Sequence, residues 1–442
     1  MAGAAGNGST GGPLRDLAPL FDDAGIERVG ADLQMARVPL ADIAARAGTP
    51  VYVYNAEVIR RSYRQLDESF ATIPHKICYA VKANSNLAVL GVLRDCGAGA
   101  DIVSGGELRR ALKAGFPAER IVFSGVGKTE AELELAVQEG LGHVHLESVE
   151  EMDELAAIAR RQQRKMKVGI RVNPEVTANT HPFIATGQGG IKFGVPIDQV
   201  LELASAIHRH EWLEMDTIAM HLGSQLLEPG PYCEGVERLL VLVAKMRASG
   251  VDTLRSMDIG GGLGIRYNHE VPLDPRDVAR MVEPLVRSSG LTLVLEPGRF
   301  LVGSAGVLLT QVLSRKHSGG KDLVIVDAGM NDLVRPSHYG AYHAMAEVKS
   351  EGRPPLRMDV VGPVCETGDF LALDRELPGL VRGDLLAILG AGAYGFVMSS
   401  TYNTRPRPAE AMVDGGKWAL VRPRIREEEI FAQETVDPEW EA

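Results

Sequence analysis

Residues 120–146 read RIVFSGVGKTEAELELAVQEGLGHVHL and contain one complete strand–helix–strand unit. The runs RIVF (120–123) and HVHL (143–146) are short, apolar and rich in β-branched residues, as is typical of buried strands. Between them, residues 129–139 have a helical pattern that begins at a threonine cap and ends at Gly140. A strand, a helix and a second strand in this order favour parallel pairing through a right-handed crossover.

The same unit recurs on both sides of this stretch. Strands are expected at 76–80, 100–103, 120–123, 143–146, 167–172, 217–221, 256–259 and 291–295. Helices are expected between them at 107–114, 129–139, 149–164, 197–209, 232–248 and 275–288. Eight such units in about 250 residues predict an α/β fold of the (β/α)8 TIM-like barrel type. An open, doubly wound sheet is the alternative.

After about residue 305 the pattern changes to strands with few helices between them. The expected strands are 307–313, 323–327, 356–361, 384–389, 409–413 and 418–421, which predict a C-terminal β-rich domain of sandwich or barrel type. Strand signals also occur before the barrel, at 30–38 and 50–54. We therefore expect a flexible N-terminal tail (1–30), a segment that packs with the β domain (31–54), the barrel (55–305) and the β domain (306–442).

Composition excludes several classes of protein. The 442 residues include 47 Lys and Arg against 58 Asp and Glu, a net charge of −11, which argues against a general nucleic-acid binder. The sequence has no apolar run long enough for a membrane span and no signal-peptide pattern at its start. Four well-separated cysteines without a CxxC pair predict reduced thiols and a cytoplasmic location.

If the barrel prediction holds, chemistry belongs at the C-terminal ends of its strands. Lys82 directly follows the first strand, where a partly desolvated lysine can form a Schiff base, although a lone surface lysine is the simpler interpretation. His221 follows the sixth strand, with Ser224 three residues later, and a histidine at that place is often structural.

The last two strands end in motifs that suit a phosphate group. Residues 260–264 (GGGLG) follow the seventh strand, and consecutive glycines allow backbone N–H groups to close around a phosphate. Residues 296–299 (EPGR) follow the eighth strand, and the loops after strands seven and eight form the phosphate site of many barrels. A tight packing turn would use glycines as well.

A lysine, a flat histidine, a glycine-rich cradle and a carboxylate on one rim are the parts that pyridoxal 5′-phosphate (PLP) needs. The carboxylate keeps the pyridine nitrogen of PLP protonated, which makes the ring an electron sink. We expect no metal: the sequence has no HExxH or Cys/His cluster, and His143 and His145 are expected on opposite faces of their strand.

Nine motifs together carry a resemblance to a known family. They are YAVKAN (79–84), DIVSGGE (101–107), HLGSQ (221–225), GGGLG (260–264), EPGR (296–299), GMNDLVRPSHYGAY (329–342), GPVCETGD (362–369), GAY (392–394) and YNTRPRP (402–408). With these motifs the sequence resembles the diaminopimelate decarboxylases, within the alanine-racemase-like, fold type III class of PLP-dependent enzymes. The resemblance covers nearly all of the chain after residue 30.

The resemblance implies roles for individual residues. Lys82 would hold PLP, His221 would stack on its ring, Glu296 would face the pyridine nitrogen, and Tyr394 would touch cofactor and substrate. The phosphate side would be bound by Ser224, Gly260, Gly261, Gly262, Pro297, Gly298 and Arg299.

The resemblance also implies a substrate site. Arg299, Arg335 and Tyr339 would hold the distal carboxylate of the substrate, and Glu366 would read its distal ammonium. Cys365 would lie beside the reacting carbon, and Cys365 or Lys82 would return a proton there. Cys365 and Glu366 would be contributed across a homodimer interface. His338 departs from the family pattern, which usually has an apolar residue at that position.

The implied activity is PLP-dependent decarboxylation of meso-2,6-diaminopimelate to L-lysine and CO2, the last step of lysine biosynthesis. Decarboxylation of ornithine, arginine or a D-diamino acid is an alternative, but a substrate without a second carboxylate would not need Arg335 and Tyr339. A racemase usually pairs the ring nitrogen with arginine rather than with a residue such as Glu296. A non-catalytic PLP-fold regulator would not need Lys82 and Cys365.

Overall fold

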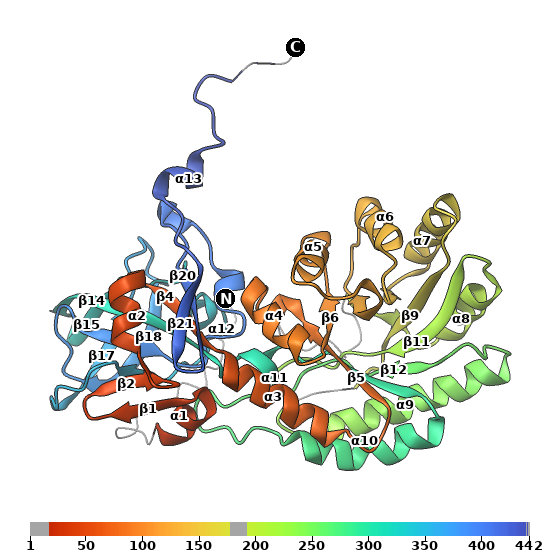
Figure 1. Cartoon of the computed structure of the whole chain (residues 1–442), viewed down its shortest axis with the longest axis horizontal. Helices are drawn as coiled ribbons and strands as arrows, with labels where there is room; N and C mark the ends of the chain where they lie inside the picture. The colour runs from red at the N-terminus through yellow and green to blue at the C-terminus, as the bar shows by residue number, and fades with distance from the viewer. Residues whose placement is uncertain (1–16, 177–191, 439, 441–442) are drawn as a thin grey trace. The chain divides into compact units, whose positions relative to one another are not determined.

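The computed structural model describes residues 17–176, 192–438 and 440. The chain forms two compact units, and Figure 1 colours them along the sequence. One unit is Ile59–Gly303, and the other combines Met1–Val58 with Ser304–Ala442. We call them the barrel unit and the β unit and describe each by itself.

The barrel unit is built on a closed ring of parallel strands. Its eight strands are β5 (His75–Ala80), β6 (Gly99–Ile102), β7 (Ile121–Phe123), β8 (His143–Leu146), β9 (Met166–Asn173), β11 (Leu213–Ala219), β12 (Ser256–Asp258) and β13 (Thr292–Leu295). Each pairs in parallel with the next, and β13 pairs with β5, which closes the ring. The short strand β10 (Val195–Pro196) pairs with β9. The prediction of a TIM-like barrel is therefore confirmed.

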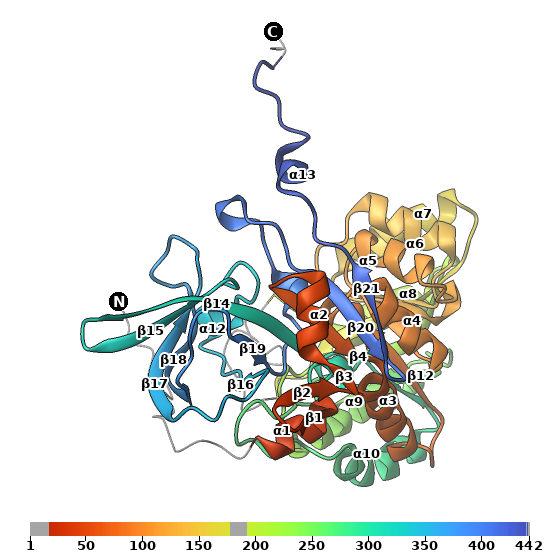
Figure 2. The ribbon, with the colours of Figure 1, turned by 60° about the vertical axis from the view of Figure 1, so that its left-hand side comes forward.

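Helices lie around the outside of the strand ring (Figures 1 and 2). They are α4 (Leu87–Asp95), α5 (Gly105–Lys113), α6 (Glu130–Glu139), α7 (Val149–Arg161), α8 (Val200–Arg209), α9 (Gly230–Ala248) and α10 (Pro275–Ser289), and α3 (Ala56–Ser69) leads into the unit. The predicted ends of α6 are confirmed. Thr129 and Glu132 form a capping box at its start, and Gly140 ends it with a left-handed φ of 69°.

A polar layer crosses the barrel interior near the N-terminal ends of the strands. His143 Nε2 lies 2.6 Å from Asp216 Oδ2, and Thr217 Oγ1 lies 2.7 Å from Ser256 Oγ. His143 therefore contacts a strand that is not its neighbour, and His145 Nδ1 likewise lies 3.9 Å from Oε1 of Glu296, which follows β13. The prediction that these histidines lie on opposite faces is wrong, because residues two apart on a strand share a face.

The β unit contains a sheet with the order β18-β17-β15-β14-β4-β20-β21. Its strands are β4 (Val51–Asn55), β14 (Gly306–Ser318), β15 (Lys321–Val326), β17 (Pro355–Val361), β18 (Phe370–Pro378), β20 (Ala409–Asp414) and β21 (Lys417–Arg422), and β16 (Met345–Glu347) and β19 (Leu385–Ile388) join it through β14. Strand β4 comes from the segment before the barrel and pairs with β14 and β20. β16 and β18 were not predicted, because β16 is short and half of β18 has charged or half-buried residues.

The prediction of a flexible tail over residues 1–30 is wrong for its second half. Residues 18–24 form helix α1 (Ala18–Ala24), and β1 (Ile26–Val29) pairs with β2 (Asp32–Met35). Leu20, Ala24 and Ile26 are buried in the core of the β unit, so a few apolar residues anchor this polar segment. Residues 1–16 lie outside the described part of the chain. The segment continues through β3 (Val38–Pro39) and α2 (Leu40–Ala47).

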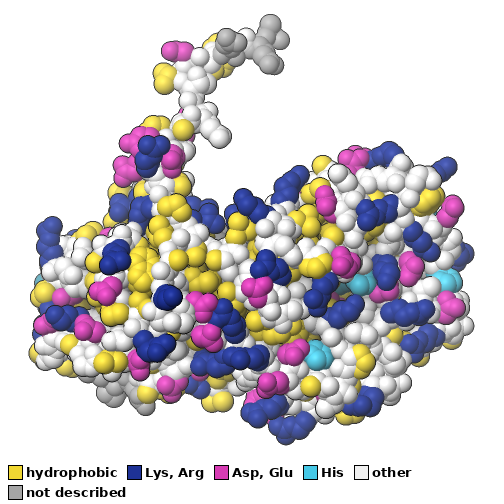
Figure 3. Space-filling model, in the orientation of Figure 1, with side chains coloured by type: hydrophobic (Ala, Val, Ile, Leu, Met, Phe, Trp, Pro, Cys, Tyr) yellow, Lys and Arg dark blue, Asp and Glu magenta, His cyan; other side chains and the backbone are white. Residues whose placement is uncertain are grey.

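Acidic and basic side chains are interspersed on the face drawn in Figure 3. A nucleic-acid-binding face would instead carry its lysines and arginines in one patch or stripe. Within the described ranges, no helix has both the length and the apolar character that a membrane crossing requires.

Candidate active site

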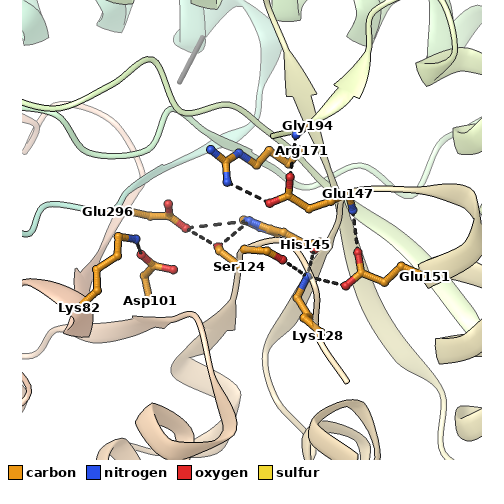
Figure 4. Close-up of polar contacts among 11 residues, drawn as sticks. Lys82, Asp101, Ser124, Lys128, His145, Glu147, Glu151, Arg171, Gly194 and Glu296 are labelled. Atoms are coloured by element: carbon orange, nitrogen blue, oxygen red, sulfur yellow. Dashed lines mark hydrogen bonds and ion pairs between the residues drawn. The ribbon is translucent and has the colours of Figure 1, made fainter. Parts of the chain in front are cut away.

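Lys82 lies at the rim formed by the C-terminal ends of the barrel strands. It is the middle residue of the one-turn helix η1 (Val81–Ala83), which directly follows β5. Its Nζ is 2.7 Å from Oδ2 of Asp101, a fully buried residue of β6 (Figure 4). The other oxygen of Asp101, Oδ1, is buried without a hydrogen-bond partner in the described part of the chain. The ion pair holds the lysine over the barrel interior.

Four polar side chains form the floor of this site. Glu296 follows β13, Asp258 ends β12, Ser124 follows β7 and His145 lies in β8. Ser124 Oγ is 3.2 Å from Glu296 Oε1 and 3.2 Å from His145 Nδ1 (Figure 4). All four are buried. Closure of the barrel therefore brings residues from four strands together.

The pKa values of the two carboxyl groups of the floor are both raised. Burial, followed by the charges of Asp101 and Asp258, raises the pKa of Glu296 well above its ordinary value. Burial also raises the pKa of Asp258 to about 7. Adjacent carboxylates in a desolvated site disfavour each other's charge, and a hydrogen bond with Asp258 raises the pKa of Glu296 further.

His145, Asp258 and Glu296 also have the spacing of metal ligands, since their donor atoms all lie within 4.8 Å of one another. No sequence motif predicted this group. A site of this kind attracts positive charge, either a metal ion or a protonated ring nitrogen.

His221 follows β11, and its Nδ1 accepts a hydrogen bond of 3.2 Å from the Gly261 N–H. Desolvation, together with the positive charges of Arg171 and Lys82, lowers the pKa of His221 well below its ordinary value. The imidazole is therefore neutral with its proton on Nε2. A neutral flat ring is suited to stacking on an aromatic cofactor.

The glycines of the seventh loop, the loop after β12, occupy positions where no side chain fits. A Cβ atom on Gly261 would lie 2.1 Å from the carbonyl oxygen of Glu296, and one on Gly260 would lie 2.5 Å from His221 Nδ1. One on Gly262 would lie 2.7 Å from the carbonyl oxygen of Gly223. The glycines are therefore needed for packing, because they allow the loops after three strands to lie in direct contact.

Arg299 begins the short helix α11 (Arg299–Val302) and is buried. Its Nη2 donates to Ser224 Oγ at 3.0 Å, and its Nη1 donates to Tyr267 Oη at 2.6 Å. Pro297 and Gly298 connect it to Glu296, and the Pro297 carbonyl accepts the Ala80 N–H at 3.1 Å. A buried cation with hydroxyl partners is suited to an anion such as a phosphate.

The other predicted residues belong to the β unit. Arg335 and Tyr339 are the first and last residues of helix α12 (Arg335–Tyr339). Nη1 of Arg335 donates to His343 Nε2 at 2.8 Å, and His343 Nδ1 donates to the Leu389 carbonyl at 2.8 Å. His343 is therefore neutral and positions the guanidinium without cancelling its charge. His338 packs edge-on against Tyr339, with ring centroids 4.5 Å apart.

Cys365 and Glu366 are exposed on the loop between β17 and β18. The Cys365 N–H donates to Asn403 Oδ1 at 2.8 Å, and the Asp369 carboxylate accepts the Val364 N–H at 2.6 Å, so the loop backbone is well anchored. A hydrogen bond to Glu366 raises the pKa of Tyr402. Tyr394 has a φ of 56°, an uncommon conformation for a non-glycine residue that occurs often at functional sites.

Asp101, Ser124, His145 and Asp258 were not predicted as site residues. Each lies at or just after the C-terminal end of a barrel strand, and Asp101 is also the first residue of the motif DIVSGGE. Arg171 was also missed. It pairs with Glu147 at 2.9 Å, and Glu147 accepts the Gly194 N–H at 2.6 Å (Figure 4).

The chain has clear relatives. Residues 56–303 match the family model described as the pyridoxal binding domain of pyridoxal-dependent decarboxylases. The chain is 47% identical to diaminopimelate decarboxylase of Pseudomonas aeruginosa over 92% of its own length and 98% of that protein.

Solved structures agree with the relatives in sequence. Diaminopimelate decarboxylase from Helicobacter pylori in complex with L-lysine superposes with a TM-score of 0.86 at 39% identity, covering 89% of this chain and 98% of that one. The enzyme from M. jannaschii in complex with L-lysine gives a TM-score of 0.89 at 31% identity, covering 93% and 98%.

The residues present fit PLP, the cofactor of that family. Among the described residues, Oδ1 of Asp101 is buried without a partner, and this oxygen and the adjacent buried carboxyl groups of Asp258 and Glu296 suit a cationic ring. Lys82 would supply the amine, and Arg299 with Ser224 would supply donors for a phosphate. The site and the relatives together show that this chain belongs to the diaminopimelate decarboxylases, within the pyridoxal-dependent decarboxylase family.

Proposed function

We propose that the chain decarboxylates meso-2,6-diaminopimelate to L-lysine and CO2 with PLP at the rim of the barrel. The observation that carries the proposal is the position of Lys82. It lies 2.7 Å from Asp101, on the rim above the buried carboxyl pair of Glu296 and Asp258. An amine of this kind binds an aldehyde, and a buried acid of this kind binds a ring nitrogen.

When bound, PLP would supply an electron sink for the loss of the substrate carboxylate. Lys82 would hold the cofactor through its side-chain amine. Glu296 would face the ring nitrogen, and burial raises the pKa of its carboxyl group, which favours a proton at this contact. The imidazole of His221 would stack on the ring. Ser224, the glycine amides and Arg299 would bind the phosphate.

The substrate roles belong to the β unit and rest on the family resemblance. Arg335 and Tyr339 hold the distal carboxylate together with Arg299. The contact with His343 supports this role, because it orients the Arg335 guanidinium, and a guanidinium binds a carboxylate in a bidentate manner. Glu366 selects the distal ammonium, and Tyr394 contacts both cofactor and substrate. Cys365 lies beside the reacting carbon and, with Lys82, is a candidate to return the proton.

We propose a homodimer in which each site receives Cys365 and Glu366 from the second subunit. Their exposure on an anchored loop supports this role, since they are presented outward within one protomer. The four well-separated cysteines, none of them in a CxxC pair, support a reducing compartment such as the cytoplasm.

The test is CO2 release by the purified, PLP-loaded chain from meso-diaminopimelate, with ornithine, arginine and lysine as competing substrates. We expect a clear preference for diaminopimelate. Lys82→Ala is expected to abolish release and the visible absorbance of bound PLP, whereas Lys113→Ala, on the exposed end of α5, is expected to leave both unchanged. A preference for another substrate would exclude the proposed specificity, and retained absorbance in Lys82→Ala would exclude the role of Lys82.

A further inference from the structure

Glu296 is held by a short hydrogen-bonded chain of protein groups. Ser124 Oγ lies 3.2 Å from Glu296 Oε1 and 3.2 Å from His145 Nδ1, while His145 Nδ1 itself is 3.9 Å from Glu296 Oε1 (Figure 4). Ser124 therefore stands between the other two. At least nine-tenths of each of the three residues is shielded from solvent, so their hydrogen bonds are made with one another rather than with bulk water.

The surrounding chain fixes the two residues relative to each other. Lys128 Nζ donates to the carbonyl oxygens of Gly125 and His145, each at 2.7 Å, and so joins the segment after Ser124 to the strand of His145. The ring of His145 occupies space left open by a glycine of β9. A Cβ atom on Gly169 would lie 2.6 Å from Cδ2 of that ring. The arrangement is thus built into the barrel.

The number of protons decides the direction of the hydrogen bonds. The Ser124 hydroxyl has one proton and faces two acceptors, so one of its neighbours must donate to it. When Glu296 is ionised opposite a protonated ring nitrogen, only His145 can be that donor. His145 then carries its proton on Nδ1.

We propose that Ser124 and His145 are positioning residues for Glu296. His145 Nδ1–H donates to Ser124 Oγ, and the Ser124 hydroxyl donates to Glu296 Oε1, which fixes the carboxylate that faces the pyridine nitrogen of the cofactor. This inference rests on the proposed role of Glu296, and it adds two residues that do not touch the substrate. Their effect reaches the reaction through the orientation of Glu296.

The first test removes the serine hydroxyl in the full-length, PLP-loaded chain. Ser124→Ala is expected to weaken PLP binding and to lower kcat by about tenfold each, because a buried hydrogen bond to a charged group is lost. KM for diaminopimelate is expected to stay within about twofold. Ser124→Thr keeps the hydroxyl and is expected to restore both values. The matched control is Ser256→Ala, a buried serine in the lower layer of the same barrel, which is expected to change neither value.

The second test uses the geometry of the histidine. The amide nitrogen of an asparagine takes the place of Nδ1, whereas that of a glutamine takes the place of Nε2. His145→Asn is therefore expected to retain more PLP affinity and a higher kcat than His145→Gln, which is expected to lose as much as Ser124→Ala. This pair decides the question if Ser124→Ala does not fold. Equal behaviour of the two histidine variants would overturn the proposal.

The third test separates this inference from the role of Glu296. In a Glu296→Gln background, Ser124→Ala is expected to add less than about a twofold change, because both act through one contact. An equal effect of Ser124→Ala with and without Glu296 would show a merely structural role and overturn the inference. If Glu296→Gln alone changes neither PLP affinity nor kcat, the proposed role of Glu296 fails. If it changes both while Ser124→Ala changes neither, only the inference fails.

Discussion

The site depends on Gly261 having no Cβ atom. The backbone of the seventh loop passes so close to the residue after β13 that a methyl group would lie 2.1 Å from the carbonyl oxygen of Glu296. On its other side, the Gly261 carbonyl accepts a hydrogen bond of 2.9 Å from Tyr232 Oη on α9. The loop cannot move away from Glu296 without losing that bond.

We therefore expect Gly261→Ala to destabilise the protein by at least about 2 kcal/mol and to release PLP, because backbone atoms rather than a flexible side chain must move. The control is Gly91→Ala, in the middle of α4 with open space around it, which should raise stability by roughly 0.5–1 kcal/mol. Urea unfolding and retention of visible absorbance after dialysis measure the two effects. Equal stability of both variants would contradict this account of the loop.

Some site residues could be predicted from the sequence, and others could not. Lys82, His221 and Glu296 follow strands in recognisable motifs, and the structure places all three on one rim. Ser124 and His145 are common residue types without a motif of their own. They become partners of Glu296 only because barrel closure brings β7, β8 and β13 together. These contacts join residues far apart in the sequence, so a local sequence pattern cannot predict them.

At the scale of elements, local signals predicted structure well where they were strong. Helix α6 begins at the predicted threonine and ends at the predicted glycine, because capping is decided by neighbouring residues. Helix α1 was missed, because it is short and is stabilised by burial of Leu20 and Ala24 in a core built mostly from distant strands. Tertiary packing of this kind cannot be predicted from the seven residues of the helix alone.

The polar layer near the start of the barrel strands gives a prediction about pH. Burial alone would raise the pKa of Asp216, but the hydrogen bond and charge of His143 outweigh it and lower that pKa to about 2, from an ordinary 3.8. A carboxyl group whose pKa is lowered by folding stabilises the protein above its ordinary pKa. That stabilisation is lost as the pH falls from about 4 to about 2.

Asp216→Asn should therefore be less stable than the original chain at neutral pH, and the difference should shrink below about pH 4. Urea midpoints at about pH 7, 5, 4 and 3 measure this trend. Asp153→Asn, at an exposed position of α7, serves as the control and should follow the original chain at every pH. A gap for Asp216→Asn that stays constant down to about pH 3 would exclude the pairing with His143 as its cause.

At the scale of the whole molecule, the proposed dimer predicts complementation between inactive subunits. Lys82→Ala and Cys365→Ala damage different parts of the site, which the proposal assigns to different protomers. Mixing them under conditions that exchange subunits should restore about a quarter of the original activity, since half of the dimers are mixed and each has one intact site. A mixture of Lys82→Ala with Glu296→Gln should restore nothing, because both residues come from the same barrel. Failure of the first mixture to regain activity would argue against shared sites.

Strand β4 has a consequence for how the protein is made. It precedes the barrel in the chain, yet both of its neighbours in the sheet, β14 and β20, follow the barrel. During synthesis on the ribosome, β4 emerges first, and neither of its partner strands is available until all of Ile59–Gly303 has been synthesised. The barrel, whose neighbouring strands are mostly close in sequence, is fully synthesised before β14 emerges. During translation an apolar strand, VYVYN, therefore stays unpaired beside a growing chain, a state in which chaperone binding protects against aggregation.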